Sequence, residues 1–380
     1  MSRIPTLILS ACAAVAGAGF APAAAAQTAD TPPKPAAPSK KAKPAAPAAK
    51  TPAPAPQAAP AAPAEDPTLT LFRHDLINML ALSGDARKQV AAAQLAAPDE
   101  KDASRSAVKK TPALLKRALE LGPQDPLVLW VAASNPCLTQ PGCTDPDALK
   151  TLQTVDADNA AVWLQSYPTE GNAELQRASV ARMAQAQRYN EYWGADVVAL
   201  YHALEVLPVP KEITSLGMSS ESARINFATT IASSILPVSL QRLHQFCIKL
   251  DPAADPTTVS DCIAVARKLE AGGTFVAQGI GYAIEQALLQ PGVDKDVMGT
   301  RRRSGAWQKE KFIELSGRFS REPELARAYI AALEAAPDEP SAVIAFLRGQ
   351  NQHTDPPGDW QPAPPPKVPD PLQSSPPQQP

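Results

Sequence analysis

The chain has 380 residues, with 36 basic against 38 acidic side chains and a formal net charge of −2. This balance excludes the strong positive field that nucleic-acid-binding proteins use, so no nucleic-acid partner is expected. More than half of the 42 prolines lie before residue 68 or after residue 350. The sequence therefore predicts one folded domain over residues 68–350, between two proline-rich flanks.

The N-terminus has the features of an export signal. Arg3 provides a positive charge, residues 4–20 are apolar or small, and three alanines ending at Ala26 form a small-residue cleavage site. These features predict a signal peptide over residues 1–26. After cleavage near Ala26, the mature protein is expected in the bacterial periplasm or outside the cell.

A second signal overlaps the first. Leu9-Ser10-Ala11-Cys12 matches a bacterial lipoprotein cleavage box, which would leave a lipid anchor on Cys12. The apolar run itself is too short and too rich in Ala and Gly for a membrane span, so no transmembrane segment is expected in the mature chain. Both signals predict a location outside the cytoplasm.

Two proline-rich segments flank the domain. Residues 27–67 consist mainly of Ala, Pro, Lys and Thr, and residues 351–380 are rich in Pro, Gln and Ser. Such compositions bury little apolar surface, so they predict a disordered linker and a disordered tail. Alternatively, the lysines of the linker could contact an anionic envelope polymer, and the tail around Trp360 could serve as a docking peptide.

Apolar residues recur at helical spacing from the start of the domain. Leu69, Phe72 and Leu76 fall on one face of a predicted helix. A second helical pattern ends near Ala97, and a third runs from about residue 104 to residue 121.

One short pattern occurs twice between residues 112 and 167. Three residue pairs are separated by the same 33 positions (163 − 130 = 33): Leu119 and Leu152, Asp125 and Asp158, and Trp130 and Trp163. A fixed period of this size is typical of helical repeats. A third copy of the helix exit lies at residues 332–340.

The residues around this pattern resemble the tetratricopeptide family. The matching residues are a small residue, Ala118, a proline at the helix exit, Pro123, and an aromatic residue early in the next helix, Trp130. In that family each unit is a pair of antiparallel helices. The resemblance implies a degenerate helical-repeat protein of the cell envelope, all-α, with antiparallel helix hairpins stacked as an irregular solenoid.

Four cysteines remain after the predicted signal peptide: Cys137, Cys143, Cys247 and Cys262. An even number of cysteines in an exported chain predicts disulfides, and the short separations favour Cys137 with Cys143 and Cys247 with Cys262. Zinc is the alternative, but neither spacing is Cys-x2-Cys. No metal and no cofactor are therefore expected.

Tyr189, Tyr192, Trp193 and Tyr201 form the densest aromatic group of the chain. Tyr and Trp anchor many protein interfaces, so these four are candidate partner-binding residues. The alternative is that they fill the space between packed helices.

The signals for chemistry are weak. His202 and Glu205 have a His-x-x-Glu spacing on a predicted helix, but no second histidine ligand follows, and His202 could simply be packed. Arg301-Arg302-Arg303 could bind an anion, or it could be a solvated loop. Neither Gly-x-Ser-x-Gly nor His-Glu-x-x-His occurs in the sequence. We therefore assign no catalytic residue.

These patterns favour an exported, non-enzymatic α-helical repeat protein that binds another protein or an envelope polymer. One alternative is a cell-envelope enzyme whose active site combines residues far apart in the sequence. The other is a structural spacer, in which the tails matter more than the domain.

Overall fold

The computed structural model describes residues 67–96, 110–134, 145–168, 172–214, 217–235 and 239–362. Within these ranges every regular element is a helix, and strand-like pairing is confined to one isolated bridge between Asn159 and Arg188. This confirms the predicted all-α class. The predicted signal peptide and all of the predicted linker before Pro67 lie outside the described residues.

The helices are, in chain order, α2 (Pro67–Ala81), α3 (Ala86–Ala96), α4 (Lys110–Leu121), α5 (Pro126–Ala133), α6 (Pro146–Val155), α7 (Ala160–Gln165), α8 (Ala173–Gln185), α9 (Trp193–Leu204), α10 (Lys211–Thr214), α11 (Ser220–Ser233), α12 (Ser239–Cys247), α13 (Pro256–Ala271), α14 (Phe275–Leu288), α15 (Val293–Ser316), α16 (Pro323–Ala335) and α17 (Glu339–Gly349).

Polar side chains explain where several helices begin. Asp125, Asn159 and Asp338 each accept hydrogen bonds from backbone N–H groups in the first turn of α5, α7 and α17. These N–H groups have no carbonyl partner within the helix, so the cap stabilises the helix start. All three caps lie at the helix exits that the repeated pattern indicated. In the second copy the cap is one residue later than the matching Asp158.

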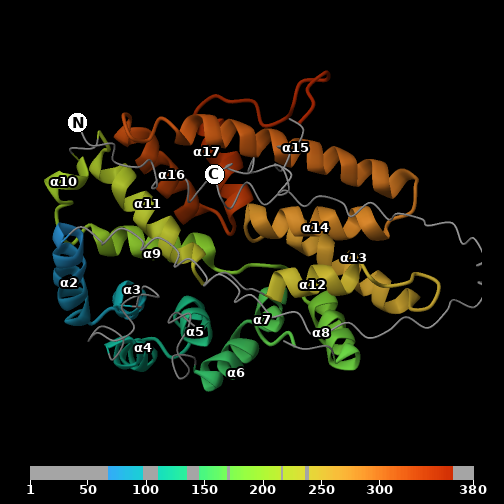
Figure 1. Cartoon of the computed structure of the whole chain (residues 1–380), viewed down its shortest axis with the longest axis horizontal. Coiled ribbons are helices and arrows are strands. Elements are labelled where there is room, and N and C mark those ends of the chain that lie inside the picture. The colour runs from blue at the N-terminus through green and yellow to red at the C-terminus, as the bar shows by residue number, and fades with distance from the viewer. Residues whose placement is uncertain are drawn as a thin grey trace, which may run out of the picture.

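Helices α3 to α8 form a row along the lower side of the molecule in Figure 1. From α2 to α8, each helix packs against the one that follows it in the chain. Consecutive helices joined by short connections commonly pack in this way.

Helix α9 lies between this row and the later helices (Figure 1). It packs against α3 of the row and also against α11 and α16, while α8 packs against α13. These contacts join helices that are far apart in the sequence. Leu200 and Leu204 of α9 and Trp130 of α5 are fully buried at this junction, and one polar pair, Asp196 of α9 and Gln94 of α3, is buried with them.

Four aromatic rings hold the last three helices together. Phe312 of α15, Phe319 after it, Tyr329 of α16 and Phe346 of α17 form one cluster, with ring centroids between 4.8 and 6.4 Å apart. Most of the pairs meet edge to face, which the charge distribution of aromatic rings favours. The cluster fixes α15 against α16 and α17.

The chain continues beyond α17 as a packed segment. Residues 351–362 lie along α15, and side chains of that helix donate hydrogen bonds to their carbonyl groups. Packing therefore extends past residue 350, where the sequence predicted that the domain would end. The rest of the predicted tail, residues 363–380, lies outside the described residues.

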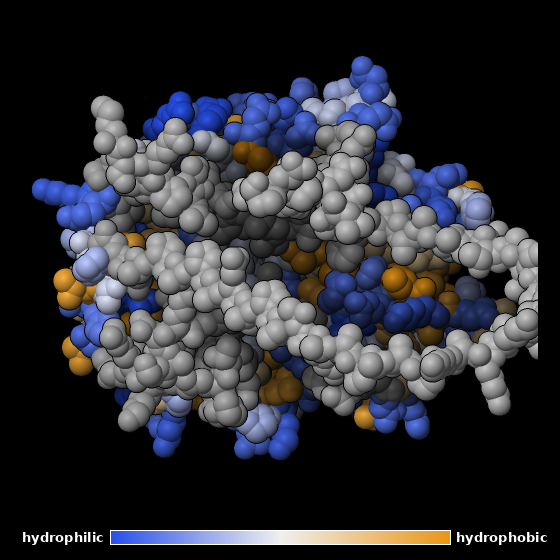
Figure 2. All heavy atoms as spheres, viewed as in Figure 1, coloured by the Kyte–Doolittle hydropathy of each residue, from blue (hydrophilic) through white to orange (hydrophobic). Residues whose placement is uncertain are grey.

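The described surface is mainly polar. Hydrophilic residues predominate along the upper edge in Figure 2, where α15 lies. Six of the exposed large apolar side chains belong to two helices: Leu71, Met79 and Leu82 lie on or directly after α2, and Val293, Val297 and Ile313 lie on α15. Of the helices described, none combines the length and the apolar character needed to cross a bilayer.

Candidate functional site

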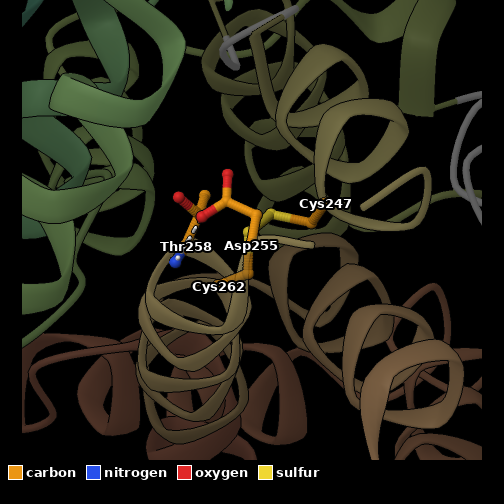
Figure 3. Close-up of a disulfide and its surroundings, with 4 residues drawn as sticks. All are labelled: Cys247, Asp255, Thr258 and Cys262. Carbon is orange, nitrogen blue, oxygen red and sulfur yellow. Dashed lines mark hydrogen bonds between the residues drawn. A yellow bond between two sulfur atoms is a disulfide. The ribbon is translucent and has the colours of Figure 1, made fainter. Parts of the chain in front are cut away.

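A disulfide joins Cys247 of α12 to Cys262 of α13, with the two Cα atoms 5.9 Å apart (Figure 3). This is the pairing that the sequence predicted. Next to it, Asp255 accepts a hydrogen bond from the backbone N–H of Thr258 and so caps α13. Arg177 of α8 donates to the same carboxylate at 2.7 Å. The start of α13 is therefore tied to two other helices.

The second predicted pair, Cys137 with Cys143, lies outside the described residues. Its pairing stays a prediction.

The four candidate aromatic residues are almost entirely buried. The exposed fractions are 3 % for Tyr189, 8 % for Tyr192, 8 % for Trp193 and 3 % for Tyr201. The polar atoms of the first three make internal hydrogen bonds. These rings therefore do not form an exposed platform. They fill the space between helices, which the sequence analysis weighed as the alternative.

Four connections between helices meet beside these rings. In the α8–α9 loop, the Asn190 backbone N–H donates to Asn159 Oδ1 at 2.8 Å, and Asn159 Nδ2 donates to the Asn190 carbonyl at 2.7 Å. Asn190 Nδ2 also donates to the carbonyl of Pro337 in the α16–α17 loop, at 2.8 Å. The Glu339 N–H donates to the Gly273 carbonyl, so the α13–α14 loop is part of the same hydrogen-bond network.

The two glycines of the α13–α14 loop allow this close approach. Gly273 has a φ of +71°, and a Cβ there would lie 2.6 Å from the Tyr189 ring. A Cβ on Gly272 would lie 2.3 Å from the Tyr189 carbonyl oxygen. Both positions therefore require glycine, one for its conformation and both for space.

Two carboxyls lie at the start of α14: Glu191 is buried and Glu339 is partly buried. Glu339 accepts a hydrogen bond from the Phe275 N–H at 2.8 Å, and Glu191 accepts one from the Tyr189 hydroxyl at 2.9 Å. Burial raises the pKa of Glu339 to about 7, although the Phe275 hydrogen bond lowers it. Burial also raises the pKa of Glu191, while hydrogen bonds from Thr274 and Tyr189 lower it. Glu191 of the α8–α9 loop and Glu339 at the start of α17 are therefore both linked to the start of α14.

The joined loops form one wall of an open groove of about 850 Å³. The other wall is α13. Three cationic residues line the groove, Arg188, Arg267 and Lys268, against one acidic residue, Asp338. Tyr189 and Tyr192, two of the candidate partner-binding residues, line it too. The other two candidates do not.

Each cationic side chain of the groove is held by a partner. Arg188 pairs with Asp156, and Arg267 Nε donates to Glu285 at 2.9 Å. Lys268 Nζ donates to the Ala184 carbonyl at 2.8 Å, and burial lowers its pKa. These contacts fix the three side chains, and carboxylates outside the groove lining, Asp156 and Glu285, pair with the two arginines.

A smaller hollow of about 420 Å³ adjoins the groove, with which it shares Gln185 and Ala186. Arg182 and Trp163 line it, and the Arg182 guanidinium lies 5.0 Å from the centre of the Trp163 ring. This distance is typical of a cation–π contact. Asp158 lines the same hollow, so its charged lining consists of one cationic and one acidic residue.

His202 meets two carboxylates away from both hollows. Nδ1 lies 2.8 Å from Glu205, and Nε2 lies 2.6 Å from Glu334. Burial lowers the pKa of His202, but the two carboxylates outweigh this and raise it. The imidazole is about half exposed, so it is not the packed core residue that the sequence allowed. In the described ranges, no group of three or more His, Cys, Asp or Glu side chains has an arrangement that could hold a metal ion.

The three consecutive arginines lie within α15, so the interpretation as a solvated loop was wrong. Arg301 donates to Glu270 at 2.9 Å and to Glu285 at 2.6 Å. Burial and the nearby Glu285 raise the pKa of Glu270 to about 8, although Arg301 lowers it. Arg302 contacts a glutamine of α14, and Arg303 contacts the segment after α17. Each of the three arginines therefore contacts another part of the same chain.

No protein family, curated protein or solved structure matches the chain. The resemblance to tetratricopeptide repeats therefore stays a prediction from the helix ends. Two of those helix ends, around Asp156 and Pro337, lie at the groove. The sequence analysis missed Arg188, Arg267 and Lys268, because they share no spacing that would have indicated a common site.

Proposed function

We propose that the protein is an exported, non-enzymatic helical binding protein, and that the groove between the α8–α9 loop and α13 is its binding site. The observation that carries this proposal is an open groove with three fixed cations and a single acidic residue in its lining. The ligand is an anionic segment of a partner protein or an anionic envelope polymer.

The lining suits such a ligand for two reasons. Arg188 and Arg267 present guanidinium groups, which can form paired, charge-assisted hydrogen bonds with carboxylate or phosphate groups. Tyr189 and Tyr192 add aromatic surface at the same place. Because the loops are joined to one another by hydrogen bonds, little ordering would be needed when the ligand binds.

Export is part of the same proposal. The disulfide between Cys247 and Cys262 supports an oxidising compartment, because such bonds are rare in the cytosol. It agrees with the predicted signal peptide, cleaved near Ala26, and with a periplasmic or secreted protein. A lipid anchor at Cys12 remains the alternative to a freely soluble form.

We also propose that α4 to α8 are a degenerate repeat array, stacked as an irregular solenoid. The supporting observations are the sequential packing of these helices and the caps at the repeated helix exits. In this arrangement, α12 and α13 pack against α7 and α8 at one end of the array.

Site-specific photo-crosslinking in the producing cell tests the proposed groove. A photoreactive residue at Gln187, which is exposed and lines the groove, should give a reproducible covalent adduct. The same residue at Lys150, exposed on α6, should not. The Arg188→Ala change should abolish the adduct. Its partner Asp156 is only 10 % exposed, so circular dichroism of the variant checks that the fold is kept. Equal labelling at both sites, or labelling that is insensitive to Arg188→Ala, would refute the proposal.

A further inference from the structure

Helix α15 holds the segment after α17 through side-chain donors. Trp307 Nε1 donates to the His353 carbonyl at 2.9 Å, and Gln308 Nε2 donates to the Thr354 carbonyl at 3.2 Å. Arg303 Nε donates to the carbonyl of Trp360 at 2.9 Å. In these contacts the helix provides side chains and the segment provides its backbone.

Arg303 makes the largest number of these contacts. Its second nitrogen donates to the Gly358 carbonyl at 2.9 Å and also to the Pro357 carbonyl. The Pro357 carbonyl accepts a further hydrogen bond from the Trp360 N–H, at 3.1 Å, which closes a tight turn. A planar guanidinium with several fixed donors is well suited to reading three carbonyl groups on one turn.

An aromatic contact completes the site. The rings of Trp307 and Trp360 meet edge to face, with centroids 5.3 Å apart and an interplanar angle of 77°. The Lys311 ammonium lies 4.8 Å from the centre of the Trp307 ring. Arg303 and Trp307 are four residues apart on α15, so they lie on the same face of the helix.

The segment has the chemistry of a docking peptide. It reads Asp355-Pro356-Pro357-Gly358-Asp359-Trp360, with two acidic residues and no basic one. Prolines restrict the free peptide, which lowers the entropy lost on binding, and aromatic surfaces recognise such segments in several protein families.

We propose that the surface formed by Arg303, Trp307 and Gln308 of α15 is a second binding site, independent of the groove. Its ligand is a segment of a partner protein that contains proline and tryptophan, since Arg303 binds the carbonyl groups of a proline-containing turn and Trp307 packs against Trp360. Residues 353–360 occupy the site within the same chain and compete with that partner. The tether makes this competition strong, because a short linker gives an effective concentration on the order of millimolar.

A peptide-binding measurement on the full-length chain tests this proposal. The probe is a fluorescent peptide with the sequence of residues 351–362, measured by anisotropy. In one variant, residues 353–360 are replaced by a Gly-Ser sequence of the same length, which removes the Trp360 ring and the two prolines, weakens the tethered competitor and leaves the chain length unchanged. This variant should bind the peptide at least about tenfold more tightly than the wild type, since the tethered competitor is weakened.

A second change identifies the site. Arg303→Ala in the Gly-Ser variant should abolish peptide binding, whereas Arg117→Ala, on an exposed part of α4, should leave it unchanged. Circular dichroism of each variant checks that the fold is kept. Absence of binding to the Gly-Ser variant, or binding that survives Arg303→Ala, would overturn the proposal. A wild-type dimer that Arg303→Ala dissociates would overturn the assignment to a partner protein, because the segment of a second copy would then fill the site.

Discussion

Asp196 is expected to make the stability of this protein fall as the pH rises. The residue lies in the first turn of α9 and is buried against α3, where Gln94 Nε2 donates to its Oδ2 at 2.7 Å. Its other oxygen, Oδ1, and the Gln94 Oε1 are buried without a hydrogen-bond partner. Burial raises the pKa of Asp196 from 3.8 to about 7, although the hydrogen bond from Gln94 lowers it.

The sign of the effect follows from this shift. Above pH 3.8 the unfolded chain releases the Asp196 proton, whereas the folded chain keeps it until about pH 7. Unfolding therefore becomes more favourable across this range, and levels off above it. The difference between the two pKa values corresponds to about 4 kcal/mol in total, of which about 2–3 kcal/mol falls between pH 5 and pH 8.

The Asp196→Asn variant tests this reasoning. The amide is neutral at every pH, can accept the hydrogen bond from Gln94, and can donate to the Gln94 Oε1. Urea unfolding at pH 5, 6, 7 and 8 should show that the variant loses about 2–3 kcal/mol less than the wild type over this range. The control is Asp147→Asn, the same chemical change at an exposed position of α6. Equal pH slopes for the wild type and Asp196→Asn would show that the buried carboxyl is ionised, and would refute the argument.

Three further changes have defined outcomes in urea unfolding. Serine at both Cys247 and Cys262 should destabilise the protein by about 3 kcal/mol, because the bond closes a loop with a sequence separation of 15; no loss would mean that the bond is not formed. Gly273→Ala should cost about 1–3 kcal/mol, because its positive φ and a buried tyrosine ring oppose a Cβ, whereas Gly279→Ala, with open space within α14, should cost nothing. Arg301→Ala should destabilise the protein by about 3 kcal/mol at pH 8, because it leaves the buried Glu270 and Glu285 without this partner. The loss should be smaller at pH 5, where Glu270 is protonated and carries no negative charge for Arg301 to neutralise. A loss that does not depend on pH would contradict this reasoning.

The sequence by itself determined the features that depend on residues close together in the chain. The helical class follows from apolar spacing, and the caps at Asp125 and Asp338 lie in the repeated helix exits. The pairing of Cys247 with Cys262 was predictable because a short break between two helices brings their ends together. The most widely separated residues among these local features, Cys247 and Cys262, are 15 positions apart.

Only the tertiary structure decided which residues form the two proposed sites. Arg188 and Lys268 line one groove because the α8–α9 loop meets α13, and neither segment signals this contact on its own. Trp360 was read as part of a tail, but it packs against Trp307 of α15. Tyr201 was a candidate for an exposed contact, yet it is buried. The physical reason is that burial and charge neighbours arise from contacts between distant helices, which local periodicity does not encode.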